Sequence, residues 1–280
     1  MNAFWLSYLT VREAVFKGTL LFFFAVANVI IAFFIFAIDS TNGDLSIFGN
    51  PITPRGISDF NAVDFLFLQL FSGSTFWVIL FGLFATAGLI PAMLEKGTVE
   101  LYVSKPISRP LLLMSRSVGA CAGIALNLVY FALAIWLIIG VKTGIWHQGF
   151  LLASLTVIPL FFFYYSVVAL IALVSNSTGF SIMFALVFWF FSSALHVREM
   201  ALYPWWDNPV FHRLLDSLYY ATPQISAMLE SATKLIGPDI MRRPTALAQG
   251  GFDPLPFLYS LLSSSLLYAI ASWRFSRKDY

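Results

Sequence analysis

The residues best suited to chemistry in this sequence are its three histidines, His147, His196 and His212. An imidazole side chain can act as a general acid or base near neutral pH, or as a metal ligand. Asp216 follows His212 by four residues, the spacing that places two side chains on the same face of a helix. One histidine and one carboxylate do not make a catalytic site. We therefore expect structural roles for all three histidines, and we predict no catalytic residues and no metal ligands.

Signatures of enzymes and of nucleotide binding are absent from the chain. It contains no GxxxxGK[ST] phosphate-binding loop, no HExxH pattern and no GxSxG pattern. The single cysteine, Cys121, lies inside an apolar run, where it cannot form an internal disulfide. We expect no cofactor in this chain. A membrane-embedded enzyme that modifies lipids is an alternative, but it needs a polar cluster at one membrane face, and the sequence suggests none.

The composition indicates that much of the protein surface faces lipid. Of the 280 residues, 59% are hydrophobic and only 11% are charged, whereas a soluble domain usually carries about 25% charged residues. So few charged side chains cannot cover an apolar core of this size. The net charge of +2 gives no reason to expect a nucleic-acid partner.

Six apolar runs approach or reach the roughly twenty residues that a helix needs to cross a bilayer. They cover residues 18–38, 65–89, 117–141, 149–174, 179–195 and 257–273. The runs are continuous and do not alternate, so they predict helices and exclude a barrel. We predict an all-α integral membrane protein with one transmembrane domain over residues 1–280. The polar residues from Ser175 to Thr178 predict a tight hairpin between spans four and five; the alternative is one bent, partly re-entrant segment.

The predicted spans contain no aspartate, glutamate, lysine, arginine or histidine, which argues against a pump that carries its own proton or ion coupling. We interpret Asn28, Gln69 and Asn127 as partners in hydrogen bonds between helices and not as substrate ligands. Four glycines are expected to permit close helix contacts: Gly73, Gly82, Gly119 and Gly123.

The distribution of basic residues predicts the orientation, because lysine and arginine favour cytoplasmic loops. With a cytoplasmic N-terminus, the inner segments hold nine basic and four acidic residues, and the outer segments hold seven basic and ten acidic residues. We therefore expect both termini in the cytoplasm.

Residues 1–17 are expected to form an amphipathic interfacial helix along the inner leaflet. Its predicted apolar face consists of Phe4, Tyr8, Val11 and Val15, with Trp5 and Leu9 beside it. Its predicted polar face consists of Ser7, Thr10, Glu13 and Lys17. The alternative is a disordered terminus.

The outer segment 196–256 is too long for a plain connection and is rich in tryptophan and tyrosine, which favour membrane interfaces. We expect one or two short helices within 211–229, broken at Pro223. Such a segment can gate an outer exit, contact an extracytoplasmic partner or form a passive cap.

The inner segment 91–116 carries the most specific pattern. Gly97 is expected to end the emerging helix, and Pro106 to end a short helix over 98–103. Ser108 is a suitable N-cap for a second start, with Pro110 in its first turn. We expect a short helix across the membrane surface, with mixed charges that suit the groove of a soluble partner. The alternative is an ordinary basic connection.

The stretch EKGTVELYVSKPISR resembles the signature of the type-2 ABC exporter permeases, in particular their NosY-like branch. The matching positions are Glu95, Gly97, Thr98, Glu100, Leu101, Ser104, Lys105, Pro106, Ile107, Ser108 and Arg109. The motif covers about fifteen residues, and the six-span plan extends the likeness along the chain.

This resemblance implies a permease subunit in a prokaryotic inner membrane. It implies pairing with a second permease copy and with a separate P-loop ATPase, which would carry the ATP and Mg²⁺. The segment from Glu95 through Lys96 to Arg109 would be the coupling helix that docks on the ATPase. The N-terminal helix, with Trp5, Arg12, Glu13 and Lys17, would pack beside it and touch the ATPase. Substrate export and transmission of motion to an outer partner both fit this family, and a scaffold subunit without transport is a further alternative.

Overall fold

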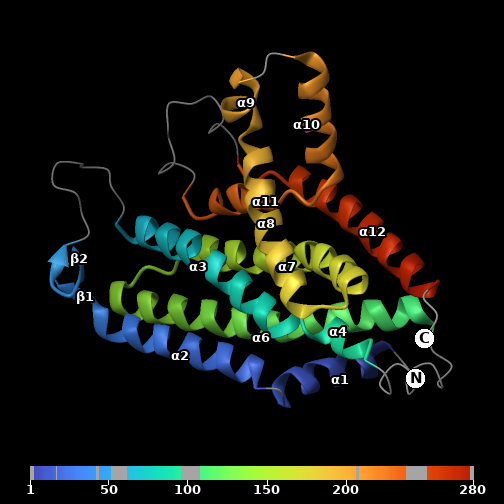
Figure 1. Ribbon diagram of the computed structural model, residues 1–280. Coiled ribbons are helices and arrows are strands. Elements are labelled where there is room, and N and C mark those ends of the chain that lie inside the picture. Colours follow the sequence, from blue (N-terminus) through green and yellow to red (C-terminus); the bar gives the residue numbers. More distant parts are fainter. Residues whose placement is uncertain are drawn as a thin grey trace.

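The computed structural model describes residues 3–16, 18–41, 44–51, 62–95, 108–205, 208–237 and 251–277. Within these ranges, six helices are long and apolar enough to cross a membrane. They are α2 (Thr19–Ala37), α3 (Ala62–Thr86) continued by α4 (Leu89–Met93), α6 (Arg109–Thr143), α7 (Gln148–Ser175), α8 (Thr178–His196) and α12 (Leu255–Ser276). The chain is thus a multi-pass, predominantly helical membrane protein (Figure 1).

The remaining elements are short and lie before, between and after these spans. They are α1 (Ala3–Phe16), β1 (Ile38–Thr41), β2 (Asp44–Ile47), β3 (Asn50–Pro51), α9 (Arg198–Ala201), the 3₁₀ helix η1 (Tyr203–Trp205), α10 (Pro209–Ala221) and α11 (Ile225–Thr233). The helices α10 and α11 occupy the segment where short helices were expected, and the chain breaks between them around Pro223.

The helices alternate in direction, so their connections gather at two ends of the bundle. One end, here called the α4 end, holds α4, the first residues of α2, α6 and α8, and the last residues of α12. The other end, here called the α10 end, holds α9, α10 and α11, whereas the small sheet lies apart from them, beside the end of α2 (Figure 1). The helices α9 and α10 lie on the opposite side of the molecule from α1 and α2 (Figure 1).

The helix α7 forms the centre of the bundle and packs against α3, α6, α8, α11 and α12. Its largest buried side chains, Phe161, Tyr164 and Tyr165, are almost completely inaccessible. A buried tyrosine hydroxyl needs a hydrogen-bond partner. Tyr165 donates to the carbonyl of Thr86 on α3 at 2.9 Å, and Tyr164 donates to the carbonyl of Ala185 on α8. These bonds join three spans at the core.

A small antiparallel sheet after α2 departs from the all-α prediction. The strands β1 and β2 pair Ile38 with Ile47, and a two-residue loop, Phe48 and Gly49, leads into β3. Both loop residues have positive φ, 51° and 77°. This conformation matches the hairpin turn whose twist suits neighbouring strands, and it favours glycine.

The hairpin predicted between spans four and five is present. The helix α7 ends at Ser175, and Asn176 has the left-handed conformation (φ 52°) that commonly ends helices. Ser177 begins α8 and accepts a hydrogen bond from the amide of Phe180. The helices on both sides of this turn, α7 and α8, are each long and apolar enough to cross a membrane.

Candidate functional site

The residues that resemble a coupling helix have both described flanks at the α4 end. Glu95 follows α4 and is exposed, and Ser108 precedes α6 and is exposed. The residues between them lie outside the described ranges: Lys96, Gly97, Thr98, Glu100, Leu101, Ser104, Lys105, Pro106 and Ile107. The described residues therefore place both ends of this connection at the α4 end.

The connection is shorter than the predicted segment 91–116. Pro91 and Met93 are buried within α4, and the chain after Ser108 is already helical. Ser108 takes the N-cap position with Pro110 in the first turn, as predicted, although its side chain makes no capping hydrogen bond. The helix that begins there is not short, because it continues for 35 residues through the third span. A proline in the first turn costs no hydrogen bond and permits this continuity.

Arg109, predicted to face a partner, instead binds the end of the last span. Its guanidinium donates to the carbonyls of Phe275 at 3.0 Å and Ser276 at 3.1 Å. These carbonyls belong to the final turn of α12. The carbonyl groups of a final turn have no hydrogen-bond partner inside their own helix. A cation at this position also complements the negative end of the helix dipole. Arg109 therefore links the start of α6 to the end of α12.

Arg116 lies two turns further along α6 and binds the N-terminal helix. Its side chain is almost fully buried and forms an ion pair with Glu13 of α1. Next to it, the Ser7 hydroxyl donates to the carbonyl of Ser115 at 3.0 Å. A β-carbon built on Gly119 would lie 2.6 Å from that of Thr10, so the two helices are in close contact.

This packing defines the orientation of α1. Ser7, Thr10 and Glu13 were assigned to the polar face of an interfacial helix, and that face packs against α6. Trp5, Tyr8 and Leu9 are exposed, as expected of an apolar surface next to lipid. Arg12 is exposed and lies over the Phe16 ring at 5.2 Å. Lys17 lies outside the described ranges.

The junction of α1 and α2 is fixed by a glycine and a threonine. Gly18 has a φ of 74°, which lets the chain turn between the two helices without strain. The Thr19 hydroxyl lies 3.2 Å from the carbonyls of Ala14 in α1 and Ala85 in α3. The N-terminal helix is therefore connected to α2, α3 and α6.

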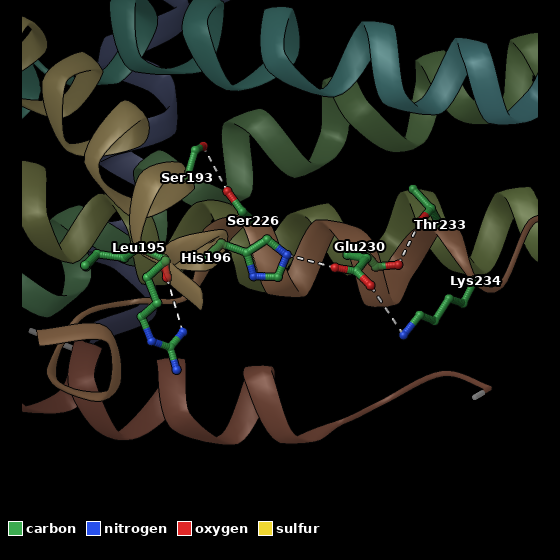
Figure 2. A network of polar contacts seen from close by, with 8 residues as sticks. Ser193, Leu195, His196, Ser226, Glu230, Thr233 and Lys234 are labelled. Atoms are coloured by element: carbon green, nitrogen blue, oxygen red, sulfur yellow. Dashed lines mark hydrogen bonds and ion pairs between the residues drawn. The ribbon is translucent and has the colours of Figure 1, made fainter. Parts of the chain in front are cut away.

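The α10 end contains a second polar network, which joins α8 to α11 (Figure 2). The His196 ring donates from Nε2 to Glu230 at 2.8 Å, and Lys234 lies 3.6 Å from the same carboxylate. The hydrogen bond from His196 holds the pKa of Glu230 below its usual range. Ser193 and Ser226 form a further hydrogen bond between the same helices at 2.9 Å.

Arg198 organises the neighbouring segment and is only 6% exposed. Its guanidinium donates to Asp216 at 2.7 Å and lies over the Tyr219 ring at 4.0 Å. The Tyr203 hydroxyl donates to the same carboxylate at 2.7 Å, and these two hydrogen bonds lower the pKa of Asp216. His212 stacks on the Tyr203 ring at 3.9 Å. The pair His212 and Asp216 thus belongs to a network that fastens α10 to α9.

The third histidine lies at the same end and begins α7. Its Nδ1 accepts a hydrogen bond from the amide of Phe150, and its Nε2 lies 3.3 Å from Asp64. Each ring nitrogen of His147 therefore has a partner in the fold. No group of three or more histidine, cysteine, aspartate or glutamate side chains able to hold a metal ion is present among the described residues.

Sequence reasoning missed the two buried arginines, Arg116 and Arg198. A usable signal existed for Arg116, since it directly precedes the third apolar run and Glu13 stands five residues before the first run. The pairing of these charges across about one hundred residues follows only from the packing of α1 on α6. Comparisons with known proteins add no identity: no protein-family model matches the chain, and no curated protein matches it.

Proposed function

We propose that this chain is the transmembrane permease subunit of an ABC transporter, driven by a separate ATPase that docks at the α4 end. The membrane would be the inner membrane of a prokaryote, with both termini in the cytoplasm. A second copy of the chain would complete the permease. The transported substrate, or the outer protein that receives the motion, would engage the α10 end.

One observation carries this proposal. The connection that resembles a coupling helix is bracketed by exposed Glu95 and Ser108, and the first two turns of α6 beyond it bind the last span through Arg109 and the first helix through Arg116. A force applied to this connection would therefore reach three helices at once. An ordinary connection has no need for such links.

The length of α6 supports the same mechanism. Leu20 of α2 lies against Gly123, and Lys142 donates to the carbonyls of Ile35 and Ile38 at the other end of α2. The 14 residues from Arg109 to Ala122 therefore extend beyond the start of α2, a length of about 20 Å. We infer that this extension projects from the bilayer at the α4 end and acts as a lever for the docked ATPase.

The test is purification of the tagged chain from its own membranes, with mass spectrometry of every accompanying protein. We expect a P-loop ATPase, and we expect Glu95→Lys to lower its recovery about tenfold, the loss of about 1.4 kcal/mol of docking energy. Arg213→Glu is the matched control, because Arg213 is exposed on α10 at the opposite end.

Two results would count against the proposal. One is the absence of any P-loop protein from the purified chain. The other is equal recovery of the ATPase with both variants. Turnover of a lipid by the chain alone would favour the membrane-enzyme alternative.

A further inference from the structure

The spans α2, α3 and α6 leave a hollow of about 570 Å³ between them. Its walls are apolar and rich in aromatic rings, and only two side chains in the lining, Gln69 and Ser74, are polar. The lining residues are Phe23, Val26, Ala27, Ile30 and Phe34 of α2, Gln69, Leu70, Gly73, Ser74, Trp77, Val78 and Phe81 of α3, and Leu128 and Phe131 of α6. All three helices cross the membrane, so the hollow lies at the depth of the lipid chains.

The dimensions of the hollow fit one hydrocarbon chain. It follows α2 from Phe23 to Phe34, a distance of about 17 Å along the helix axis. A bilayer core of about 30 Å holds two acyl chains end to end, so one chain covers about 15 Å.

Phe81 divides this hollow from a smaller one of about 470 Å³ near Gly18 and Thr19. Its ring lies 6.0 Å from the Trp77 ring and 6.1 Å from the Phe23 ring. These rings lie at the α4 end of the larger hollow, so a chain that enters from the other end would end against them. The polar end of the occupant then lies at the opposite, α10 end.

Gln69 lies at that end and is exposed within the lining. Its side chain makes no hydrogen bond to any residue in the described part of the chain. An amide at hydrocarbon depth that finds no acceptor among the described residues would gain from one in the lipid, because lipid tails offer none. The ester carbonyl of a lipid is such an acceptor and is attached directly to an acyl chain.

We propose that the hollow between α2, α3 and α6 binds one acyl chain of an ester-linked membrane lipid, whose ester carbonyl accepts a hydrogen bond from the Gln69 amide. This lipid site goes beyond the proposed function and does not depend on an ATPase. It assigns a role to Gly73, where an added β-carbon would meet nothing within 4 Å. The absence of a side chain at this position keeps the hollow open.

The test uses the full chain in vesicles of phosphatidylcholine and phosphatidylglycerol. A small fraction of the phosphatidylcholine carries a photoreactive diazirine in one chain, as a diester or as the matching diether. After illumination, labelled peptides are mapped by mass spectrometry. We expect the peptides that line the hollow to be labelled more strongly than the exposed surface of α8 around Met183 and Val187.

Two variants separate a bound chain from random contact with lipid. Gly73→Phe places a ring in the hollow from a position where an added β-carbon meets no atom within 4 Å, and it should lower the labelling of the hollow about tenfold. Gly179→Phe is the matched control, because Gly179 of α8 also has open space around it. Gln69→Leu should abolish an approximately fivefold preference for the diester over the diether, the effect of one hydrogen bond.

Equal labelling of the hollow and of α8, or labelling that neither variant changes, would overturn the proposal. An unlabelled hollow in a dimer that Gly73→Phe dissociates would identify a second copy as the occupant and would also overturn it. The ATPase recovery described above is measured separately, so each proposal can fail without the other.

Discussion

At the scale of single residues, charge pairing determines how the N-terminal helix is held. Arg116 is almost fully buried, and Glu13 is its ion-pair partner. Removing one member of such a pair leaves an uncompensated charge, whereas removing both costs much less. The main effect of the pair is therefore to determine where α1 packs, and its net contribution to the free energy of unfolding is small.

We expect Glu13→Gln to lower the free energy of unfolding by about 2 kcal/mol, because a buried guanidinium loses its counter-charge. The double variant Glu13→Gln with Arg116→Met should recover most of that loss. Thermal unfolding in detergent micelles measures both, with Arg213→Gln as an exposed control. Losses that simply add in the double variant would contradict the coupling of these two residues.

Polar residues within the spans show how far sequence reasoning reaches at this scale. The prediction for Asn28 is confirmed, since the Tyr130 hydroxyl of α6 donates to it at 2.7 Å. The prediction for Asn127 is wrong, because its amide donates to Gly123 in its own helix. Gln69 faces the hollow. Amide type alone indicates a need for a partner, and helix packing decides which partner is present.

At the scale of elements, the apolar runs predicted the spans well but not the ends of the helices. The third run begins at residue 117, whereas α6 begins at Arg109, because two turns of mixed polarity are held by α1 and α12. The second run continues through a short turn at Ala87 and Gly88 into α4. Hydropathy reports the contact with lipid, whereas helix length also depends on contacts between helices.

The role of each glycine within the spans also depends on how the helices pack. Gly82, Gly119 and Gly123 permit close contacts with Phe161, Thr10 and Leu20, as predicted. Gly73 instead borders open space. The sequence shows where a side chain is missing, and the fold decides whether a helix or a hollow occupies the space.

We expect Gly119→Ala to displace α1 from α6, because the new β-carbon would lie 2.7 Å from the backbone carbonyl of Ser7. Backbone cannot move aside as a flexible side chain can, and overpacking of this kind costs about 1–3 kcal/mol. Hydrogen exchange of residues 3–16 should become faster. The matched control is Gly179→Ala, which has no neighbour within 4 Å. Unchanged exchange in α1 would show that the two helices adapt to the extra atom.

At the scale of the whole molecule, the alternation of the spans separates two chemically different ends. The α4 end carries the segment that resembles a coupling helix. The α10 end carries the two networks around Glu230 and Arg198. The apolar runs predicted the spans that separate these two ends, whereas the networks themselves depend on contacts between α8, α9, α10 and α11.

We expect the two ends to face opposite sides of the membrane, with the α4 end in the cytoplasm. In a Cys121→Ser background, Glu95→Cys should react with a membrane-impermeant maleimide only after the membrane is opened. Val210→Cys, exposed on α10, should react in intact cells. The unaltered protein, in which Cys121 is buried, serves as the unreactive control. Labelling of both positions from the same side would contradict the six-span arrangement.

The bonds from Arg109 to the last turn of α12 also bear on biosynthesis. The donor and its two acceptors are 166 and 167 residues apart in the chain, so this contact forms only after α12 has been translated. A nascent or truncated chain that ends before α12 leaves the α6 lever without its second support and leaves the flank of α7 uncovered. The cell's membrane quality-control proteases would meet such a product with both features exposed, whereas the full-length protein conceals them.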